Sequence, residues 1–418
     1  MKYIKILFIL IIILSLYSYN FNSFADDKSD ESLPSLDIES LISTSSKINS
    51  TPKINARYAT IFDRASKTML YDKKATEKTK MASTTKIMTA IIVLENSNLN
   101  DIVKISKRAA TIGGSRLGLS TNDAISVENL LYGLLLCSGN DAAIALAEHV
   151  GGNVENFATM MNKKATSLNL SSTNFITPHG LDNDEHYTTA YELAIITDYA
   201  LKNDIFSKIV RTKSYTITIN NKAKTINNTN ELLGNLNGIY GVKTGFTNGA
   251  NRCLVTSCKR GNLDIICVVL GCDTKKDRTK DSINLINYAF NNFTTINIEE
   301  IIDKDFSNWY FTHKNNFIIN KAVSNNLDLY INKDELPYSN IAIKNEDINN
   351  ISTFISFNSF YNSPLEKKSQ IGTLDLRLSN TTLFSINILN NNYISKKNIF
   401  DYIYSFIQNY PSILKSYT

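Results

Sequence analysis

Hydrophobic residues recur with helical spacing through much of the first two thirds of the chain. Within residues 83–94, apolar side chains fall on one helical face at Ile87, Met88, Ala90, Ile91 and Leu94. The ranges 127–150, 154–168, 191–201 and 280–292 are predicted as further helices. A break at 138–140 divides the first of these ranges into two helices, and Asp281-Ser282 would lie near the cap of the last.

Strand-like segments precede and follow these helices. Residues 58–62 and 69–71 flank a polar turn and predict a hairpin, and residues 240–272 predict strands that turn at Gly261-Asn262. Helices combined with hairpins predict an α/β (α+β) domain over residues 53–293, with an antiparallel sheet and a helical lobe.

The pattern changes after about residue 295. Leu374, Leu376 and Leu378 alternate with polar residues, and the same period of two recurs over 384–388. This alternation predicts a small all-β domain, like a β-sandwich, over residues 297–392.

The segment 394–418 has a helical pattern again. Its apolar residues fall on one face behind Lys396-Lys397, and they are Ile399, Phe400, Ile403, Phe406, Ile407 and Tyr410. The segment is too short to span a bilayer. An amphipathic helix on a membrane surface and a helix packed on the β domain both remain open.

The first residues resemble an export signal. Lys2 and Lys5 precede an apolar run over 6–16, and Ser23-Phe24-Ala25 offers small residues at a cleavage site before Asp26. We therefore predict a cleaved signal peptide over 1–25, with an uncleaved anchor as the alternative. Residues 26–52 are polar and predict a flexible leader. The expected location is outside the cytoplasm, at the membrane or the cell wall.

Composition narrows the function classes. The 418 residues are 43% hydrophobic and 20% charged, with a net charge of +5 and no basic cluster interleaved with aromatic residues. Nucleic-acid binding is therefore disfavoured. The four histidines are scattered, so neither a metal nor another cofactor is expected. The five cysteines lie mostly in apolar strings and are predicted to be buried small hydrophobes, in preference to a disulfide framework.

Three short motifs carry candidate chemistry. In Ser83-Thr84-Thr85-Lys86 the hydroxyl and the amine share a helical face, so a weak nucleophile would lie beside a base. Helix capping is the alternative role of Ser83. Ser138-Gly139-Asn140 separates two helices, and Lys243-Thr244-Gly245 enters a strand, where Gly245 would allow a ligand backbone to approach. Each motif is weak alone, but their order and settings are specific.

Together the motifs and their flanks resemble the serine D-alanyl-D-alanine carboxypeptidases, the low-molecular-mass penicillin-binding proteins. The resemblance covers roughly residues 55–292 and includes Thr177-Pro178-His179-Gly180-Leu181-Asp182. It implies a β-lactamase/transpeptidase-like fold and removal of the terminal D-Ala from peptidoglycan stem peptides. It also implies acylation by β-lactams, which would act as inhibitors.

The resemblance assigns roles by position. Ser83 would attack the carbonyl of the penultimate D-Ala, Lys86 would take its proton, and Ser138 would pass a proton to the departing nitrogen. A free lysine has a pKa near 10.4, so a base at Lys86 requires burial and a nearby positive charge, which Lys243 could supply.

The remaining roles concern substrate binding. Asn140 would hold the peptide, and Lys243 and Thr244 would face the terminal carboxylate. The N–H groups of Ser83 and Phe246 would form the oxyanion hole. An arginine downstream of Lys-Thr-Gly would also bind the carboxylate, and Arg278 matches that position better than Arg252. The implied substrate-binding set is Asn140, Lys243, Thr244, Gly245, Phe246 and Arg278.

Several related functions use the same residues. A class A β-lactamase usually carries Asp where this chain has Gly139, and a Glu in a loop that activates the deacylating water. Glu192 lies in a predicted helix outside any matching motif, so that role is not assigned to it. A transpeptidase or an endopeptidase would form the same acyl-enzyme. A catalytically inactive wall-binding protein would lack Ser83 or Lys86. A Ser-His-Asp hydrolase would need G-x-S-x-G, which is absent, so His179 and His186 are expected to be structural.

Overall fold

The computed structural model describes residues 36–45 and 50–415, and it divides into two units that meet in sequence at Asn291 and Asn292. The predicted signal peptide lies outside the described residues. Within the predicted leader, residues Ile38–Ser45 form a short helix, α3, whose Ile38 and Leu41 are buried. Part of the predicted leader is therefore packed and helical.

A five-stranded antiparallel sheet forms the centre of the first unit, in the order β2-β1-β9-β8-β7. The strands are β1 (Tyr58–Asp63), β2 (Met69–Lys73), β7 (Ile239–Thr247), β8 (Asn251–Arg260) and β9 (Leu263–Cys272). Both predicted hairpins are confirmed, and Arg260 pairs with Leu263 across the turn. Residues 265–272 are all buried, because both faces of the sheet are covered.

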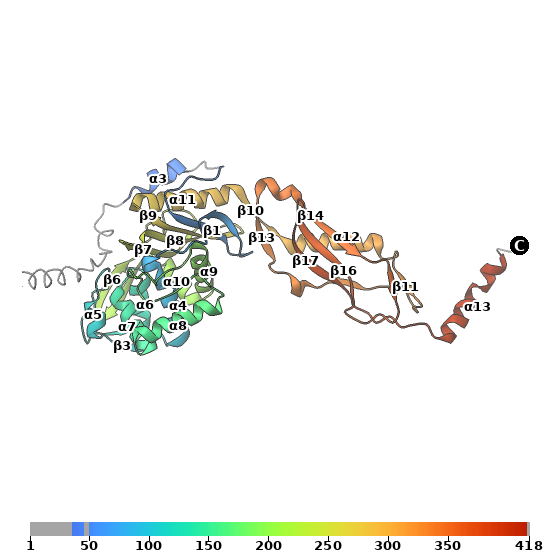
Figure 1. Cartoon of the computed structure of the whole chain (residues 1–418), viewed down its shortest axis with the longest axis horizontal. Coiled ribbons are helices and arrows are strands. Elements are labelled where there is room, and N and C mark those ends of the chain that lie inside the picture. Colours follow the sequence, from blue (N-terminus) through green and yellow to red (C-terminus); the bar gives the residue numbers. More distant parts are fainter. Residues whose placement is uncertain (1–35, 46–49, 416–418) are drawn as a thin grey trace, which may run out of the picture. The chain divides into compact units, whose positions relative to one another are not determined.

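A helical lobe covers one face of this sheet (Figure 1). It contains α4 (Lys86–Asn96), α5 (Lys107–Thr111), α6 (Val127–Leu135), α7 (Asn140–Gly151), α8 (Val154–Ser167), α9 (Ala190–Ala200) and α10 (Asp204–Arg211). Two small hairpins accompany them, β3 (Ile102–Lys104) with β4 (Ala124–Ser126) and β5 (Ser214–Ile219) with β6 (Lys222–Asn227). The predicted break between α6 and α7 is confirmed.

Helix α4 is the central helix of the lobe. Residues 86–93 are all buried, and the helix contacts α6, α7, α8 and α9. A helix surrounded by others can be apolar on every side, and residues 87–93 of this helix are apolar except for Thr89. A single 3₁₀ turn, η1 (Ala82–Thr85), leads into it.

Helix α11 (Lys275–Asn292) lies on the opposite face of the sheet (Figure 1). It begins five residues before the predicted start at 280, because its first turn is polar and gives no apolar period. Asp281 is therefore inside the helix and not at its cap. Its carboxylate accepts the N–H groups of Asn55 and Ala56, both at 2.7 Å, and ties the chain before β1 to α11.

The second unit is a four-stranded antiparallel sheet covered by a helix. The order is β12-β17-β16-β14, formed by β12 (Leu329–Ile331), β14 (Ile351–Phe357), β16 (Gln370–Leu378) and β17 (Thr381–Asn390). Two smaller pairs join β10 (Phe293–Asn297) to β13 (Asn340–Lys344) and β11 (Ile318–Asn320) to β15 (Phe360–Asn362). The alternation predicted for 374–378 and 384–388 is confirmed, since Leu374, Leu376, Ile386 and Ile388 are buried.

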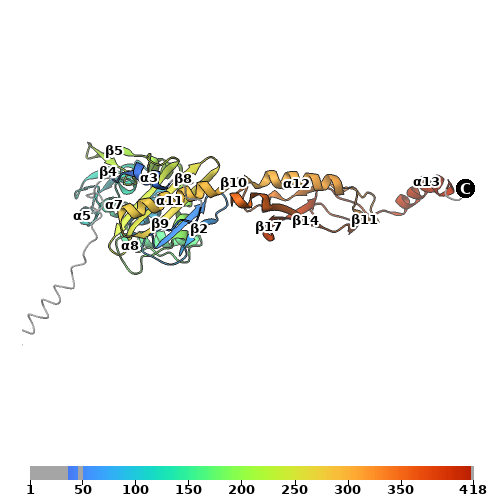
Figure 2. The same ribbon diagram turned by 90° about the horizontal axis from the view of Figure 1, so that it is seen from above.

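This unit also contains a helix that the prediction of an all-β domain omits. Helix α12 (Ile298–His313) lies along the sheet (Figure 2) and buries Ile298, Ile302 and Phe306. Its Asp305 accepts a hydrogen bond from the Thr353 hydroxyl of β14 at 2.8 Å. Its buried residues are four positions apart, which is helical spacing. The strand-like pattern of the neighbouring segments concealed this signal.

The segment between α8 and α9 carries two buried histidines. The ring of His186 accepts the N–H of Ile176 at Nδ1 (3.0 Å) and contacts the Thr85 hydroxyl with Nε2 (2.8 Å). Burial lowers the pKa of His186 to about 4. Burial, with a contribution from Lys86, holds the pKa of His179 well below its ordinary value.

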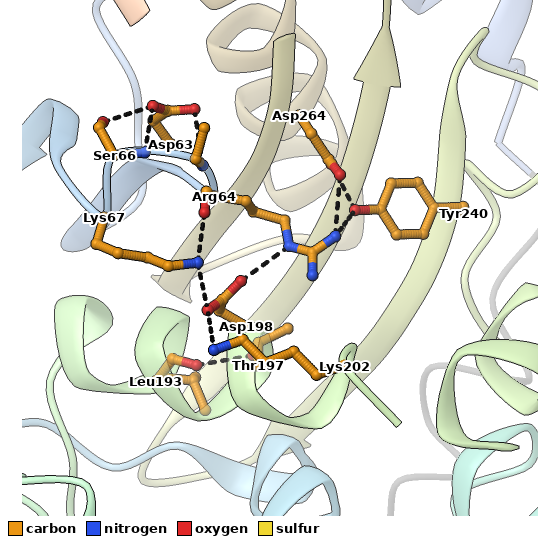
Figure 3. A network of polar contacts seen from close by, with 11 residues as sticks. Asp63, Arg64, Ser66, Lys67, Leu193, Thr197, Asp198, Lys202, Tyr240 and Asp264 are labelled. Atoms are coloured by element: carbon orange, nitrogen blue, oxygen red, sulfur yellow. Dashed lines mark hydrogen bonds and ion pairs between the residues drawn. The ribbon is translucent and has the colours of Figure 1, made fainter. Parts of the chain in front are cut away.

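An ionic network ties the helical lobe to the start of β7 (Figure 3). Arg64, in the turn after β1, donates to Asp198 of α9 (3.0 Å), to Asp264 of β9 (2.9 Å) and to the Tyr240 hydroxyl of β7 (2.9 Å). Burial and Asp264 raise the pKa of Tyr240, so the phenol stays protonated and donates to the Asp264 carboxylate. Because Tyr240 lies three residues before Lys243, the network fixes the strand that carries the third motif.

The buried histidines predict a pH dependence of stability. Between pH 6.5 and 4 the unfolded chain binds a proton at His186 that the folded chain does not, so the free energy of unfolding falls as the pH falls. His186→Gln should remove about 1.4 kcal/mol per pH unit from this slope. Urea titrations of both proteins between pH 4.5 and 7.5 measure it. Identical slopes in both proteins would show that His186 has the same pKa in the folded and the unfolded chain.

The ionic network predicts that Tyr240→Phe destabilises the first unit by about 1.5–3 kcal/mol, because it removes a buried hydroxyl bonded to charged groups. Tyr215→Phe is the control. The Tyr215 ring stacks on Tyr132 with centroids 3.5 Å apart, and its hydroxyl makes no hydrogen bond within the described structure. Urea unfolding compares the two variants, and equal losses would contradict the assigned role of the network.

Candidate active site

The first motif places a hydroxyl and an amine in direct contact. Ser83 lies in η1, and Lys86 begins α4 one turn later. The Lys86 Nζ lies 2.6 Å from the Ser83 Oγ. Neither η1 nor α4 is capped by a side chain, so the Ser83 hydroxyl faces Lys86 and does not cap the helix.

The Lys86 amine contacts four oxygen atoms. Besides Ser83, its Nζ contacts the Asn140 Oδ1 (2.8 Å), the Ser138 Oγ (3.3 Å) and the His179 carbonyl (3.1 Å). The side chain is fully buried, at 0% exposure, and all four of these oxygens belong to neutral groups. The predicted residues Ser83, Lys86, Ser138 and Asn140 therefore form one contact cluster.

The second motif is shaped by the turn between α6 and α7. Ser138 has a left-handed backbone (φ +63°), and Asn140 is the first residue of α7. The Asn140 side chain donates to the Gly113 carbonyl at 2.7 Å while its oxygen faces Lys86. Asn140 thus connects the cluster to the loop that begins at Gly113.

Asp141 holds that loop in place. Its fully buried carboxylate accepts the N–H groups of Leu117 (2.8 Å), Gly118 (2.8 Å) and Leu119 (3.0 Å). Asp141 is not among the residues for which the sequence motifs predict a role. An Asp in the first turn of a helix is ordinary, so its sequence position gives no sign of the loop that it binds.

The third motif lies on β7, at the edge of the sheet. Lys243 is buried and its amine donates to the Thr244 carbonyl at 2.9 Å. The Thr244 hydroxyl lies 2.7 Å from that of Thr229. The guanidinium of Arg252 lies over the Phe246 ring, 4.5 Å from its centroid.

Gly245 brings β7 against the first motif. A Cβ at this position would lie 3.0 Å from the Ser83 nitrogen and 3.2 Å from the Thr84 nitrogen. A side chain here would press against the backbone of η1, so glycine lets β7 lie directly against the first motif. The approach of a ligand backbone at Gly245 stays a prediction.

Arg278 is engaged in an ion pair. It lies in the first turn of α11, is 2% exposed, and donates to Glu231 at 2.7 Å. Burial opposes ionisation of Glu231, but Arg278 and the Thr279 hydroxyl outweigh it and hold the pKa of Glu231 below its ordinary value. Direct binding of a substrate carboxylate by Arg278 stays a prediction, and Glu231 is a partner that the sequence did not indicate.

The five cysteines form no disulfide bonds, and four of them are buried in β8 and β9. Burial raises the pKa of Cys258 to about 12 and raises those of Cys267 and Cys272 further still. Within the described residues, no group of His, Cys, Asp and Glu side chains is arranged to hold a metal ion.

Comparison with known proteins places this geometry in a family. The model of peptidase family S11, described as D-alanyl-D-alanine carboxypeptidase, matches residues 45–274. The D-alanyl-D-alanine carboxypeptidase DacF of Bacillus subtilis is 32% identical over 329 residues, covering 77% of this chain and 81% of the relative. DacC of Escherichia coli is 35% identical over 256 residues, covering 59% and 64%.

Solved structures agree with these relatives. Penicillin binding protein 5 from Haemophilus influenzae aligns with a TM-score of 0.67 at 28% identity, over 83% of this chain and 99% of that one. The Streptomyces K15 DD-transpeptidase aligns with a TM-score of 0.56 at 36% identity, over 58% and 99%. The resemblance that the three motifs predicted is confirmed. Since the family model matches more than half of the chain, this chain belongs to the D-alanyl-D-alanine carboxypeptidase family.

Proposed function

We propose that this chain removes the C-terminal D-Ala from peptidoglycan pentapeptide stems through an acyl-enzyme on Ser83. The observation that carries the proposal is the buried contact between the Ser83 hydroxyl and the Lys86 amine, at 2.6 Å. A serine hydroxyl needs an adjacent base to attack a peptide carbonyl. Membership of the family supports the substrate class.

In the acylation step the Ser83 oxygen bonds to the carbonyl carbon of the penultimate D-Ala, and its proton passes to neutral Lys86. Burial disfavours a charged amine, which supports a neutral base. Ser138, 3.3 Å from the Lys86 amine, would carry a proton to the departing D-Ala nitrogen as the C–N bond breaks. Water then hydrolyses the ester on Ser83 and releases the shortened stem peptide.

The negative oxygen formed during attack needs donors aimed at it. We assign this role to the N–H groups of Ser83 and Phe246. The close approach of Gly245 to the Ser83 nitrogen supports the assignment, because it places β7, which carries Phe246, directly beside η1, which carries Ser83. Asn140 would hold the peptide, and Lys243 and Thr244 would face its terminal carboxylate. The role of Arg278 would be to hold that end of the site through Glu231 or to bind the carboxylate directly.

β-Lactams would acylate the same serine, as the name of the structural relative, penicillin binding protein 5, suggests for that protein. Transfer of the acyl group to an amine is the second candidate function. The relative from Streptomyces K15, named a DD-transpeptidase, supports it, because both reactions proceed through one acyl-enzyme.

Ser83 is the predicted nucleophile. Ser83→Ala should reduce D-Ala release from a pentapeptide ending in D-Ala-D-Ala by at least about 10³-fold, since no acyl-enzyme can form. Ser50→Ala is a matched control, because Ser50 begins another Ser-x-x-Lys sequence and is exposed. Chromatographic assay of free D-Ala measures both variants.

Two outcomes would change the proposal. Undiminished release by Ser83→Ala would exclude this nucleophile. Covalent labelling of the wild type by penicillin without D-Ala release would favour an endopeptidase or a transpeptidase, which adding an amine acceptor or a cross-linked dimer would distinguish.

We also propose that the protein acts outside the cytoplasm and that α13 (Ile399–Lys415) holds it on a membrane surface. No helix in the described ranges is long and apolar enough to cross a membrane. The support for surface binding is the exposure of large apolar side chains on α13, including Phe400 at 75% and Ile399 at 66%. Such a helix can lie in the interface with its apolar face in the lipid.

This proposal predicts that deleting residues 396–418 moves the penicillin-labelled protein from the membrane to the soluble fraction. Replacing Phe400, Ile403 and Ile407 by serine should do the same, because it removes the apolar face and keeps the chain length. Gln408→Ala is the control on the same helix. Retention of the triple variant on vesicles that contain anionic lipid would rule out α13 as the anchor.

A further inference from the structure

The peptide between Ala82 and Ser83 contains both the Ala82 carbonyl and the Ser83 N–H, which is assigned to the oxyanion hole. Its carbonyl and its N–H point in opposite directions, because the peptide is planar and trans. Whatever fixes the Ala82 oxygen therefore also fixes the direction of the Ser83 N–H. Ala82 has a left-handed backbone (φ +49°), which is sparsely populated by residues other than glycine and persists where surrounding contacts impose it.

Thr85 is the group that binds this carbonyl. Its hydroxyl lies 2.8 Å from the Ala82 oxygen and 2.8 Å from the His186 Nε2. A carbonyl only accepts, so the single hydroxyl proton of Thr85 points to Ala82. His186 must then donate from Nε2 to Thr85.

The contacts of the other ring nitrogen, Nδ1, independently indicate the same tautomer of His186. The His186 Nδ1 accepts the N–H of Ile176 at 3.0 Å and that of Thr177 at 3.4 Å, so it carries no proton. One neutral tautomer, with its proton on Nε2, satisfies both ends of the ring. The ring is 2% exposed and packs edge-on against Phe175, which fixes its orientation.

Two glycines allow neighbouring segments to pack closely against the Ala82–Ser83 peptide. A Cβ at Gly180 would clash with the Ala82 oxygen, so the turn after His179 packs directly against the carbonyl. A Cβ at Gly245 would lie 3.0 Å from the Ser83 nitrogen, so β7 packs closely against the same peptide. Backbone on these two segments therefore restricts the position of the peptide.

We propose that His186 and Thr85 are positioning residues that aim the Ser83 N–H into the oxyanion hole, through a relay from the His186 Nε2–H to the Thr85 hydroxyl to the Ala82 carbonyl. The inference rests on the acylation proposed above and adds to it two residues that do not touch the substrate. The relay acts mainly on the transition state, because the oxyanion exists only there.

Thr84 provides a control within the same turn. Its hydroxyl donates to the Met81 carbonyl at 2.6 Å, one peptide earlier, and its side chain is fully buried. Threonine hydroxyls commonly bind the carbonyl three or four residues before them, so the two bonds are alike as local interactions. They differ in that only the Thr85 bond fixes the peptide that contains the Ser83 N–H.

The test uses the full chain and a fluorescent penicillin, with the pre-acylation dissociation constant and the acylation rate constant resolved by stopped flow. Thr85→Val should lower the rate constant by roughly 10- to 100-fold, less than complete loss of an oxyanion donor. The dissociation constant should stay within about twofold, since ground-state contacts are unchanged. Thr85→Ser should restore the rate, and Thr84→Val should keep it within about twofold.

A peptide boronic acid gives a second measure, because its tetrahedral adduct places an oxygen where the oxyanion forms. Its affinity should weaken in Thr85→Val by about the same factor as the acylation rate. In Thr84→Val it should not. A general loosening of the turn would weaken both variants alike.

Two substitutions of His186 test the roles of its two ring nitrogens separately. His186→Gln keeps an N–H donor that can reach Thr85, and His186→Asn keeps only an acceptor near the Ile176 N–H. The relay predicts near wild-type acylation for His186→Gln and a fall of about tenfold or more for His186→Asn. If Thr85→Val does not fold, the comparison of His186→Gln with His186→Asn tests the relay in its place.

The outcomes also separate this inference from the proposed function. Failure of penicillin to label the wild type, or labelling of Ser83→Ala, would overturn the acylation itself. Normal acylation by the wild type with equal rates in Thr85→Val and Thr84→Val would overturn only the relay. So would equal rates in His186→Gln and His186→Asn.

Discussion

The arrangement of the site depends on burying one amine. Lys86 begins the central helix of the lobe, where no part of its side chain reaches solvent, and a polar group in such a place must be given partners. Four neutral oxygens supply them, from η1, from the turn before α7, from α7 itself and from the segment after α8. Elements far apart in the chain therefore converge on a single nitrogen atom.

The residues around Lys86 are themselves held in place by further contacts. Asn140 can present its oxygen to Lys86 because its nitrogen is bound to Gly113, and that loop is held by Asp141. On the other side, the start of β7 is tied to α9 through Arg64, so the strand carrying Lys243 is fixed relative to the helical lobe. Rigid supports of this kind give a site its precision.

The sequence predicted what local patterns can encode. Helix α4, the turn between β8 and β9, and the alternation in β16 and β17 follow from spacing along the chain. Two of the three motifs marked the cluster around Lys86, and the third lies on β7 next to the first. Partners brought together by folding were missed. Thr85 and His186 are 101 residues apart, and Arg278 and Glu231 are 47 apart, so no period connects them. The polar first turn of α11 hid its true start for a related reason, because it contains no apolar residue.

The distribution of the cysteines has a practical consequence. Cys253, Cys258, Cys267 and Cys272 are buried in the sheet, and burial keeps the thiols of Cys258, Cys267 and Cys272 protonated, so thiol reagents react poorly with them. Cys137 is only half-buried and immediately precedes Ser138. Cys137 is therefore the cysteine most open to thiol reagents, and labelling it would modify the residue next to Ser138.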